Sequence, residues 1–150
     1  MKMTRKELLA RGRDYFHRFE DSRWMHEAER FLDDEGKIGR VLRYMPGMLR
    51  KKAFVPVVKD LILAYLYVSD VVKGQYKDFS RGKLLLLVAL LAYVVSPFDF
   101  VPDWLPGAGL LDDAALVGYA AHLADKELQR YYRWNREHRK GDFDVQIPAE

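Results

Sequence analysis

Apolar residues recur along this chain with the three- and four-residue spacing of helices, and no segment alternates as strands do. Three amphipathic helices are predicted in the first third, around residues 8–19, 25–32 and 38–45. The acidic run at 33–36 ends the second of them, and the Pro-Gly pair at 46–47 ends the third.

The next two predicted helices are apolar around most of their circumference. One begins at Pro56, whose missing N–H suits a first helical turn, and ends at Lys73 before Gly74. The other follows Ser80 and contains an unbroken apolar run, LLLLVALLAYVV, at residues 84–95. Helices of this kind require burial by other helices or by lipid. Because a bilayer span needs about 20 apolar residues, burial in a protein core is favoured.

Helical spacing resumes at Leu111 and continues to Lys140, where Gly141 ends the last predicted helix. Its first half is narrow enough for close approach by neighbours, because it is rich in small side chains: Ala114, Ala115, Ala120, Ala121 and Ala124. We expect residues 141–150 to form a disordered tail. The whole pattern predicts an all-α fold, a single-domain helical bundle of about five or six helices over residues 1–140.

Composition excludes several classes of chemistry. The 150 residues suffice for one core. The sequence contains no cysteine, so disulfides, thiolate metal sites and cysteine nucleophiles are excluded. It also lacks a Gly-rich phosphate loop and the HExxH and GxSxG motifs. The N-terminus has no apolar segment typical of a secretion signal, and a cytoplasmic location is expected.

Charge is distributed unevenly along the chain. Residues 1–52 contain 14 Lys or Arg against 9 Asp or Glu, whereas residues 96–125 contain five aspartates and no basic residue. Two basic patches stand out, one at 50–52 and one at 130–140, where arginines alternate with aromatic residues. Such patches suit phosphates or lipid headgroups. In the second patch, a solvated helix end with its aromatic side chains folded back onto the core is the simpler explanation.

Four aspartates occupy the segment SPFDFVPDWLPGAGLLDD at residues 96–113. Asp99 lies three residues after Ser96, a spacing similar to that of a capping box. The Pro102-Asp103 pair is expected to cap a second helical turn of the same kind. Asp112 and Asp113 are predicted in the first turn of the last helix, where negative charge is favoured. Alternatively, the four carboxylates converge on a hard cation such as Mg²⁺ or Ca²⁺. Their spacing matches no EF-hand loop, so structural capping is favoured over a metal site.

The same segment carries a resemblance to a known family. Its pattern is Ser-Pro-x-Asp-x-x-Pro-Asp, then a short apolar loop with glycine, then an Asp-Asp pair that opens a helix. This resembles the YkvA-like family of bacterial proteins, a domain of unknown function. The positions that match are Ser96, Pro97, Asp99, Pro102, Asp103, Gly109, Asp112 and Asp113. The resemblance covers about residues 84–123 and implies a helical, hairpin-like core around the loop, but no particular activity.

A catalytic group is not apparent elsewhere in the sequence. His122 and Asp125 are three residues apart and can share a helix face, but no nucleophile accompanies them. We therefore expect His122 to be a packed or surface residue.

We expect a non-enzymatic helical interaction module that associates with a protein partner or an anionic membrane surface, peripheral to the membrane. Nucleic acid is a less favoured partner. The alternative is a divalent-cation-dependent enzyme or sensor that uses Asp99, Asp103, Asp112 and Asp113.

Overall fold

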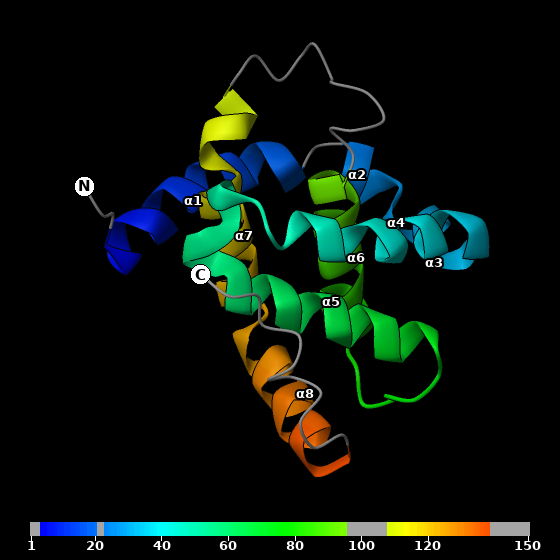
Figure 1. The fold of residues 1–150 in the computed structure, drawn as a ribbon. Coiled ribbons are helices and arrows are strands. Elements are labelled where there is room, and N and C mark those ends of the chain that lie inside the picture. Colours follow the sequence, from blue (N-terminus) through cyan, green and yellow to red (C-terminus); the bar gives the residue numbers. More distant parts are fainter. Residues whose placement is uncertain (1–3, 21–22, 96–107, 139–150) are drawn as a thin grey trace.

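The computed structural model describes residues 4–20, 23–95 and 108–138, and all regular structure within these ranges is helical (Figure 1). The all-α prediction is confirmed. In chain order the elements are α1 (Arg5–Glu20), α2 (Arg23–His26), α3 (Ala28–Asp33), α4 (Glu35–Met48), the 3₁₀ helix η1 (Lys52–Val57), α5 (Val58–Val72), α6 (Arg81–Val95), α7 (Ala108–Leu123) and α8 (Asp125–His138). Among the described residues seven α-helices have six or more residues, so the expected five or six was too low.

The additional helices come from breaks that apolar spacing does not reveal. The helix expected at 25–32 is divided into α2 and α3, and the helix expected at 111–140 is divided into α7 and α8 at Ala124. Helical hydrogen bonds continue across this second break: Ala124 N donates to Ala120 O at 3.1 Å, and Leu128 N donates to Ala124 O at 2.9 Å. The chain can therefore turn with little loss of hydrogen bonding, and α8 packs on α5 as well as on α7.

Two prolines act differently from the prediction. Pro46 does not end its helix, since α4 continues to Met48. Its missing N–H falls near the helix end, and burial of Met45 and Met48 holds the last turn in place. Pro56 does not open α5 either, because it lies within η1 and α5 begins at Val58. The 3₁₀ turns bury Phe54 and Val57, which an α-helix would place at a different angle.

Other predicted helix ends are confirmed. Asp34 separates α3 from α4, and its Oδ1 accepts hydrogen bonds from Gly36 N at 2.9 Å and Lys37 N at 3.1 Å. This is an N-cap for α4. Gly74 follows α5 with a φ of 78°, a left-handed conformation that favours glycine. The expected tail at 141–150 lies outside the described residues.

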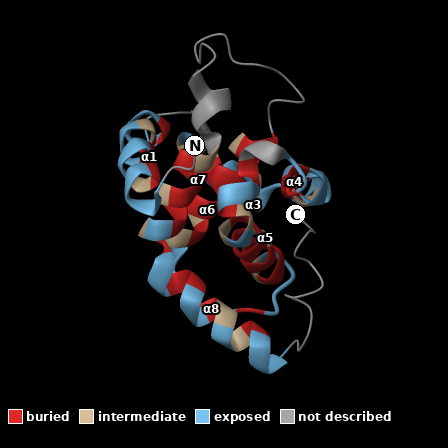
Figure 2. Ribbon diagram, turned by 60° about the vertical axis from the view of Figure 1, so that its left-hand side comes forward, coloured by how far each residue is buried: buried red, intermediate tan, exposed pale blue. Residues whose placement is uncertain are grey.

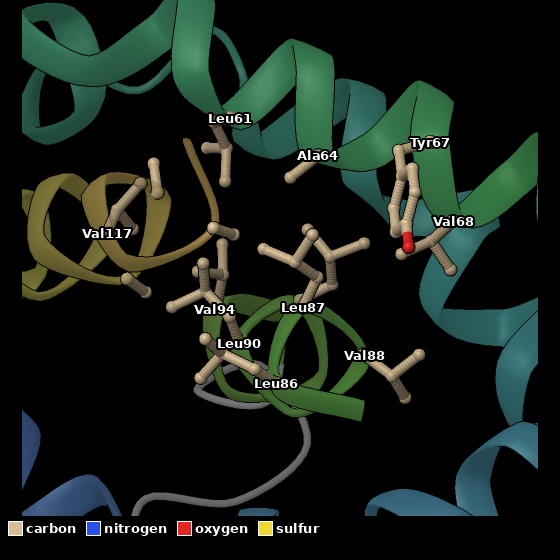
Figure 3. Close-up of a cluster of buried hydrophobic side chains, with 14 of the residues drawn as sticks. Leu61, Ala64, Tyr67, Val68, Leu86, Leu87, Val88, Leu90, Val94 and Val117 are labelled. Carbon is tan, nitrogen blue, oxygen red and sulfur yellow. The ribbon is translucent and has the colours of Figure 1, made fainter. Parts of the chain in front are cut away.

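The apolar run at 84–95 forms most of α6, and other helices bury it as predicted. Its side chains from Leu84 to Val95 are buried, except that Leu85 and Tyr93 are half-buried (Figure 2). Helix α6 packs against α2, α3, α4, α5 and α7. Leu87 and Leu90 extend from it towards the neighbouring helices that carry Leu61 and Val117 (Figure 3). None of the described helices combines the length and the apolar character that crossing a bilayer requires.

Small residues bring α1 and α7 into close contact, as the alanine-rich pattern predicted. A Cβ atom added to Gly12 would lie 2.0 Å from the carbonyl oxygen of Ala115 and 2.6 Å from Cβ of Tyr119. On α7, a Cβ on Gly118 would meet Leu8 at 3.2 Å and Val57 at 3.3 Å. The backbone of α1 therefore lies directly on α7, and only glycine fits at the crossing.

Candidate functional site

The four aspartates expected to cap helices or to bind a cation are only partly placed by the structure. Asp99 and Asp103 lie outside the described residues. Asp112 and Asp113 belong to α7, which begins at Ala108, so the expectation that they occupy the first helical turn was wrong. Helix α7 starts about one turn earlier than the two aspartates suggested. The metal hypothesis stays a prediction.

Within the described ranges, no group of three or more potential metal-ligating side chains comes together. His122 and Asp125 are both exposed, one near the end of α7 and the other at the start of α8. The His122 ring lies 6.3 Å from the Tyr119 ring. His122 is thus a surface residue, as the sequence suggested.

A buried polar cluster joins α5, the segment after it and α8. We use this name for Tyr67, Asp70, Tyr76, Glu127, Tyr131 and Asn135. In its first half, the Tyr67 hydroxyl and the backbone N–H of Ser80 both donate to Oε2 of Glu127, the latter at 2.6 Å. Since Glu127 is only 5% exposed, these donors compensate the loss of its hydration.

The second half of the cluster contains the other buried carboxylate. The Tyr131 hydroxyl donates to Oδ2 of Asp70, and Asn135 Nδ2 donates to the Tyr131 hydroxyl at 3.2 Å. The rings of Tyr67, Tyr76 and Tyr131 contact one another edge to face, with centroids 5.1–5.8 Å apart. The cluster therefore fixes α8 to the body through directional bonds as well as apolar contact.

The cluster shifts the ionisation of its tyrosines. Burial, followed by the hydrogen bond to Glu127, raises the pKa of Tyr67 well above its usual value. Burial also raises the pKa of Tyr76, and Asp78 adds to this effect. Elsewhere on α5, burial raises the pKa of Asp60, with Arg5 opposing and Asp125 reinforcing the shift. The raised pKa keeps the Tyr67 hydroxyl protonated, as a donor to Glu127 must be.

Raising the pH above about 10, where tyrosines of an unfolded chain ionise, is expected to lower the free energy of unfolding. Folded Tyr67 keeps a proton that the unfolded chain loses, so the stability it contributes is present below about pH 10 and is lost above it. Tyr67→Phe should flatten this dependence, measured by urea denaturation between about pH 8 and 11. Tyr44→Phe, which removes an exposed hydroxyl, should follow the wild-type curve. A Tyr67→Phe protein that also follows it would contradict the assignment.

A second feature, on the surface, is a basic ridge formed by α4 and the turn after it. We define it by the exposed side chains Lys37, Arg40, Arg43, Arg50 and Lys51. The spacing of the first three places them on one face of α4. The opposite face is buried through Ile38, Val41, Met45 and Met48. The core contact of α4 therefore determines which way the ridge faces.

The charge of the ridge is not balanced by its surroundings in the chain. Residues 36–59 contain seven Lys or Arg and no Asp or Glu. Within the described part of the structure, Arg40, Arg43 and Arg50 form no ion pair. Asp33, Asp34 and Glu35 lie at the N-terminal end of α4, away from Arg50 and Lys51. The ridge presents an excess of positive charge to any approaching anionic surface.

The basic patch of α8 is organised differently. Arg130 lies 3.6 Å from Oδ1 of Asp78 and 4.0 Å from Oε1 of Glu127. Tyr131 is buried, and the Trp134 ring lies 5.1 Å from that of Tyr76. The aromatic residues of this patch thus fold back onto the core, which was the simpler of the two interpretations.

Neither the buried polar cluster nor the basic ridge was predicted from the sequence. Neither Asp70 nor Glu127 was among the candidate site residues. An acidic residue within an otherwise buried helix was the available clue to Asp70, since such a group needs a donor nearby. For the ridge, the clue was the acid-free stretch 36–59, of which only residues 50–52 were recognised.

These features define an all-helical protein with a basic surface, and comparisons with known proteins place it further. The family described as "Protein of unknown function (DUF1232)" matches residues 83–119. A Bacillus subtilis (strain 168) protein described as "Uncharacterized membrane protein YkvA" is 33% identical over 88 residues, which make up 59% of this chain and 83% of that protein. No solved structure matches the chain. The chain belongs to the YkvA-like family, whose function is unknown, and the resemblance noted in the sequence is confirmed.

Proposed function

We propose that this chain is a non-enzymatic interaction module that binds anionic membrane surfaces through its basic ridge, as a peripheral protein on the cytoplasmic side. The observation that carries the proposal is the seven-residue excess of Lys and Arg over residues 36–59. Each Lys or Arg close to an anionic bilayer contributes about 1 kcal/mol of attraction. Five exposed basic side chains on one short segment are enough for measurable association.

Two further observations support a membrane over another anionic partner. The related Bacillus subtilis protein is described as a membrane protein. In addition, the ridge lies on a single helix, α4, and on the turn that follows it. A flat bilayer can contact such a ridge along its length without a complementary groove.

Vesicle flotation tests the proposal. The protein should float with vesicles that contain phosphatidylglycerol, not with phosphatidylcholine alone, and the association should weaken steeply with salt because exposed charges are screened. Replacing Arg40, Arg43 and Arg50 together by Gln should weaken binding about 100-fold, from about 1 kcal/mol per charge.

A matched control removes the same number of positive charges from another helix. Lys126→Gln, Arg133→Gln and Arg136→Gln together remove three exposed positive charges from α8. This variant should retain most of the binding. Equal losses in both triple variants would show that net charge, not the ridge, drives association. No flotation of the wild-type protein even at low salt would exclude the membrane and leave a protein partner.

A further inference from the structure

The acid-free stretch that carries the basic ridge also contains exposed apolar side chains. Over the described residues, four large hydrophobic side chains are exposed: Tyr44 and Val55 at 51% each, Val72 at 39% and Phe79 at 36%. The two most exposed of them belong to the acid-free stretch 36–59. Isolated exposed apolar residues are ordinary on a protein surface, but a pair within a segment of uniform charge points to a common contact.

Local packing determines how these two residues are presented. Tyr44 shares the exposed face of α4 with Lys37 and Arg40, because the intervals of four and seven residues return to the same side of a helix. The next residue, Met45, is fully buried and fixes the rotation of that turn. Val55 lies in η1 between Phe54 and Val57, which are 4% and 2% exposed. Both side chains are therefore held outward by buried neighbours.

We infer that Tyr44 and Val55 insert into the interfacial layer of an anionic bilayer while the basic ridge lies at the level of the phosphates. This inference rests on the proposed function and names the part of the membrane that the site contacts. A tyrosine suits this layer because its ring is apolar and its hydroxyl stays hydrated. Basic residues beside apolar ones are the usual composition of a helix that lies in the membrane interface.

Charge complementarity favours a bilayer over other binding partners of this surface. A second copy of the chain would bring one basic ridge against another, which costs free energy through repulsion. On single-stranded nucleic acid, affinity comes from bases stacked on aromatic rings, and an aliphatic valine offers no stacking surface. A bilayer accepts both the positive charge and the apolar side chains.

The absence of cysteine from the chain permits a direct test. Tyr44→Cys, Val55→Cys and Phe79→Cys are each labelled with an environment-sensitive fluorophore and added to phosphatidylglycerol-containing vesicles. Phe79 is the control because it lies beside α8, where the adjacent Ser80 N donates to Glu127. The fluorescence emission of the labels at positions 44 and 55 should shift to the blue, and lipids that carry a nitroxide near the headgroup should quench it. The emission of the label at position 79 should stay as it is in water.

A second measurement uses binding itself. The Tyr44→Ser, Val55→Ser double variant should lose roughly tenfold or more in vesicle affinity, because buried apolar area no longer contributes, while keeping the salt dependence of the wild type. The Val72→Ser, Phe79→Ser pair should bind as the wild type does. Flotation without quenching at 44 and 55 would overturn the insertion and leave the electrostatic proposal standing. Absence of flotation would overturn both.

Discussion

Replacement of Gly12 by alanine is expected to destabilise the protein by about 2–3 kcal/mol, near the upper end of typical overpacking costs. The added Cβ would lie 2.0 Å from the carbonyl oxygen of Ala115, so α1 and α7 must separate. The obstacle is backbone, which cannot rotate aside as a flexible side chain can. Urea denaturation that follows helical circular dichroism measures the change in the free energy of unfolding.

Gly39→Ala is the matched control. Gly39 also lies inside a helix, α4, but an added Cβ would have no neighbour within 4 Å. Alanine there should stabilise the protein by about 0.5–1 kcal/mol, because it lowers the backbone entropy of the unfolded chain. The two substitutions therefore have opposite expected signs. If Gly12→Ala were neutral, the close crossing of α1 and α7 would be refuted.

Replacement of Glu127 by alanine is the second substitution with a large expected effect. It leaves the buried Tyr67 hydroxyl without its acceptor and removes the hydrogen-bond partner of the N–H of Ser80, an exposed residue. A buried donor left unsatisfied costs about 1–3 kcal/mol, so a loss of about 2 kcal/mol is expected. Thermal and urea unfolding should both report it. Glu127→Gln should cost less, since both donors bind the same carboxylate oxygen and an amide oxygen in its place can accept both hydrogen bonds.

Glu137→Ala controls for the loss of a negative charge from the same helix. Glu137 is exposed, so its removal should change stability by no more than about 0.5 kcal/mol. A Tyr67→Phe, Glu127→Ala double variant should lose less than the sum of the single losses, because both remove the same hydrogen bond. Additive losses would mean that this bond does not contribute to stability.

The all-helical class of the fold and the central core could be predicted from the sequence because both depend on local spacing and composition. The apolar run at 84–95 predicts a buried helix from its length alone, and α6 is buried in the structure. Asp34 starts α4 because its side chain accepts hydrogen bonds from free N–H groups of the first turn, and Gly74 follows the end of α5 because glycine readily adopts a positive φ. Both reasons are local to the chain.

The local sequence pattern could not predict the features that depend on contacts between distant segments. Pro46 looks like a helix end until burial of Met45 and Met48 is known. Glu127 resembles a surface residue until α8 brings it to Tyr67, sixty residues away in sequence. The four aspartates were the strongest motif, and half of them lie outside the described residues.

The sequence by itself determined that this protein is all-α, that residues 84–95 are core, and that it belongs to the YkvA-like family. Spacing, chain length and motif are properties of neighbouring residues. Tertiary structure alone decided which charges are buried and which form a surface. The face of α4 that packs on the core leaves Lys37, Arg40 and Tyr44 exposed together, and the turn of the chain at Ala124 buries Glu127. Burial of a charged group depends on partners far along the chain, and no local pattern encodes them.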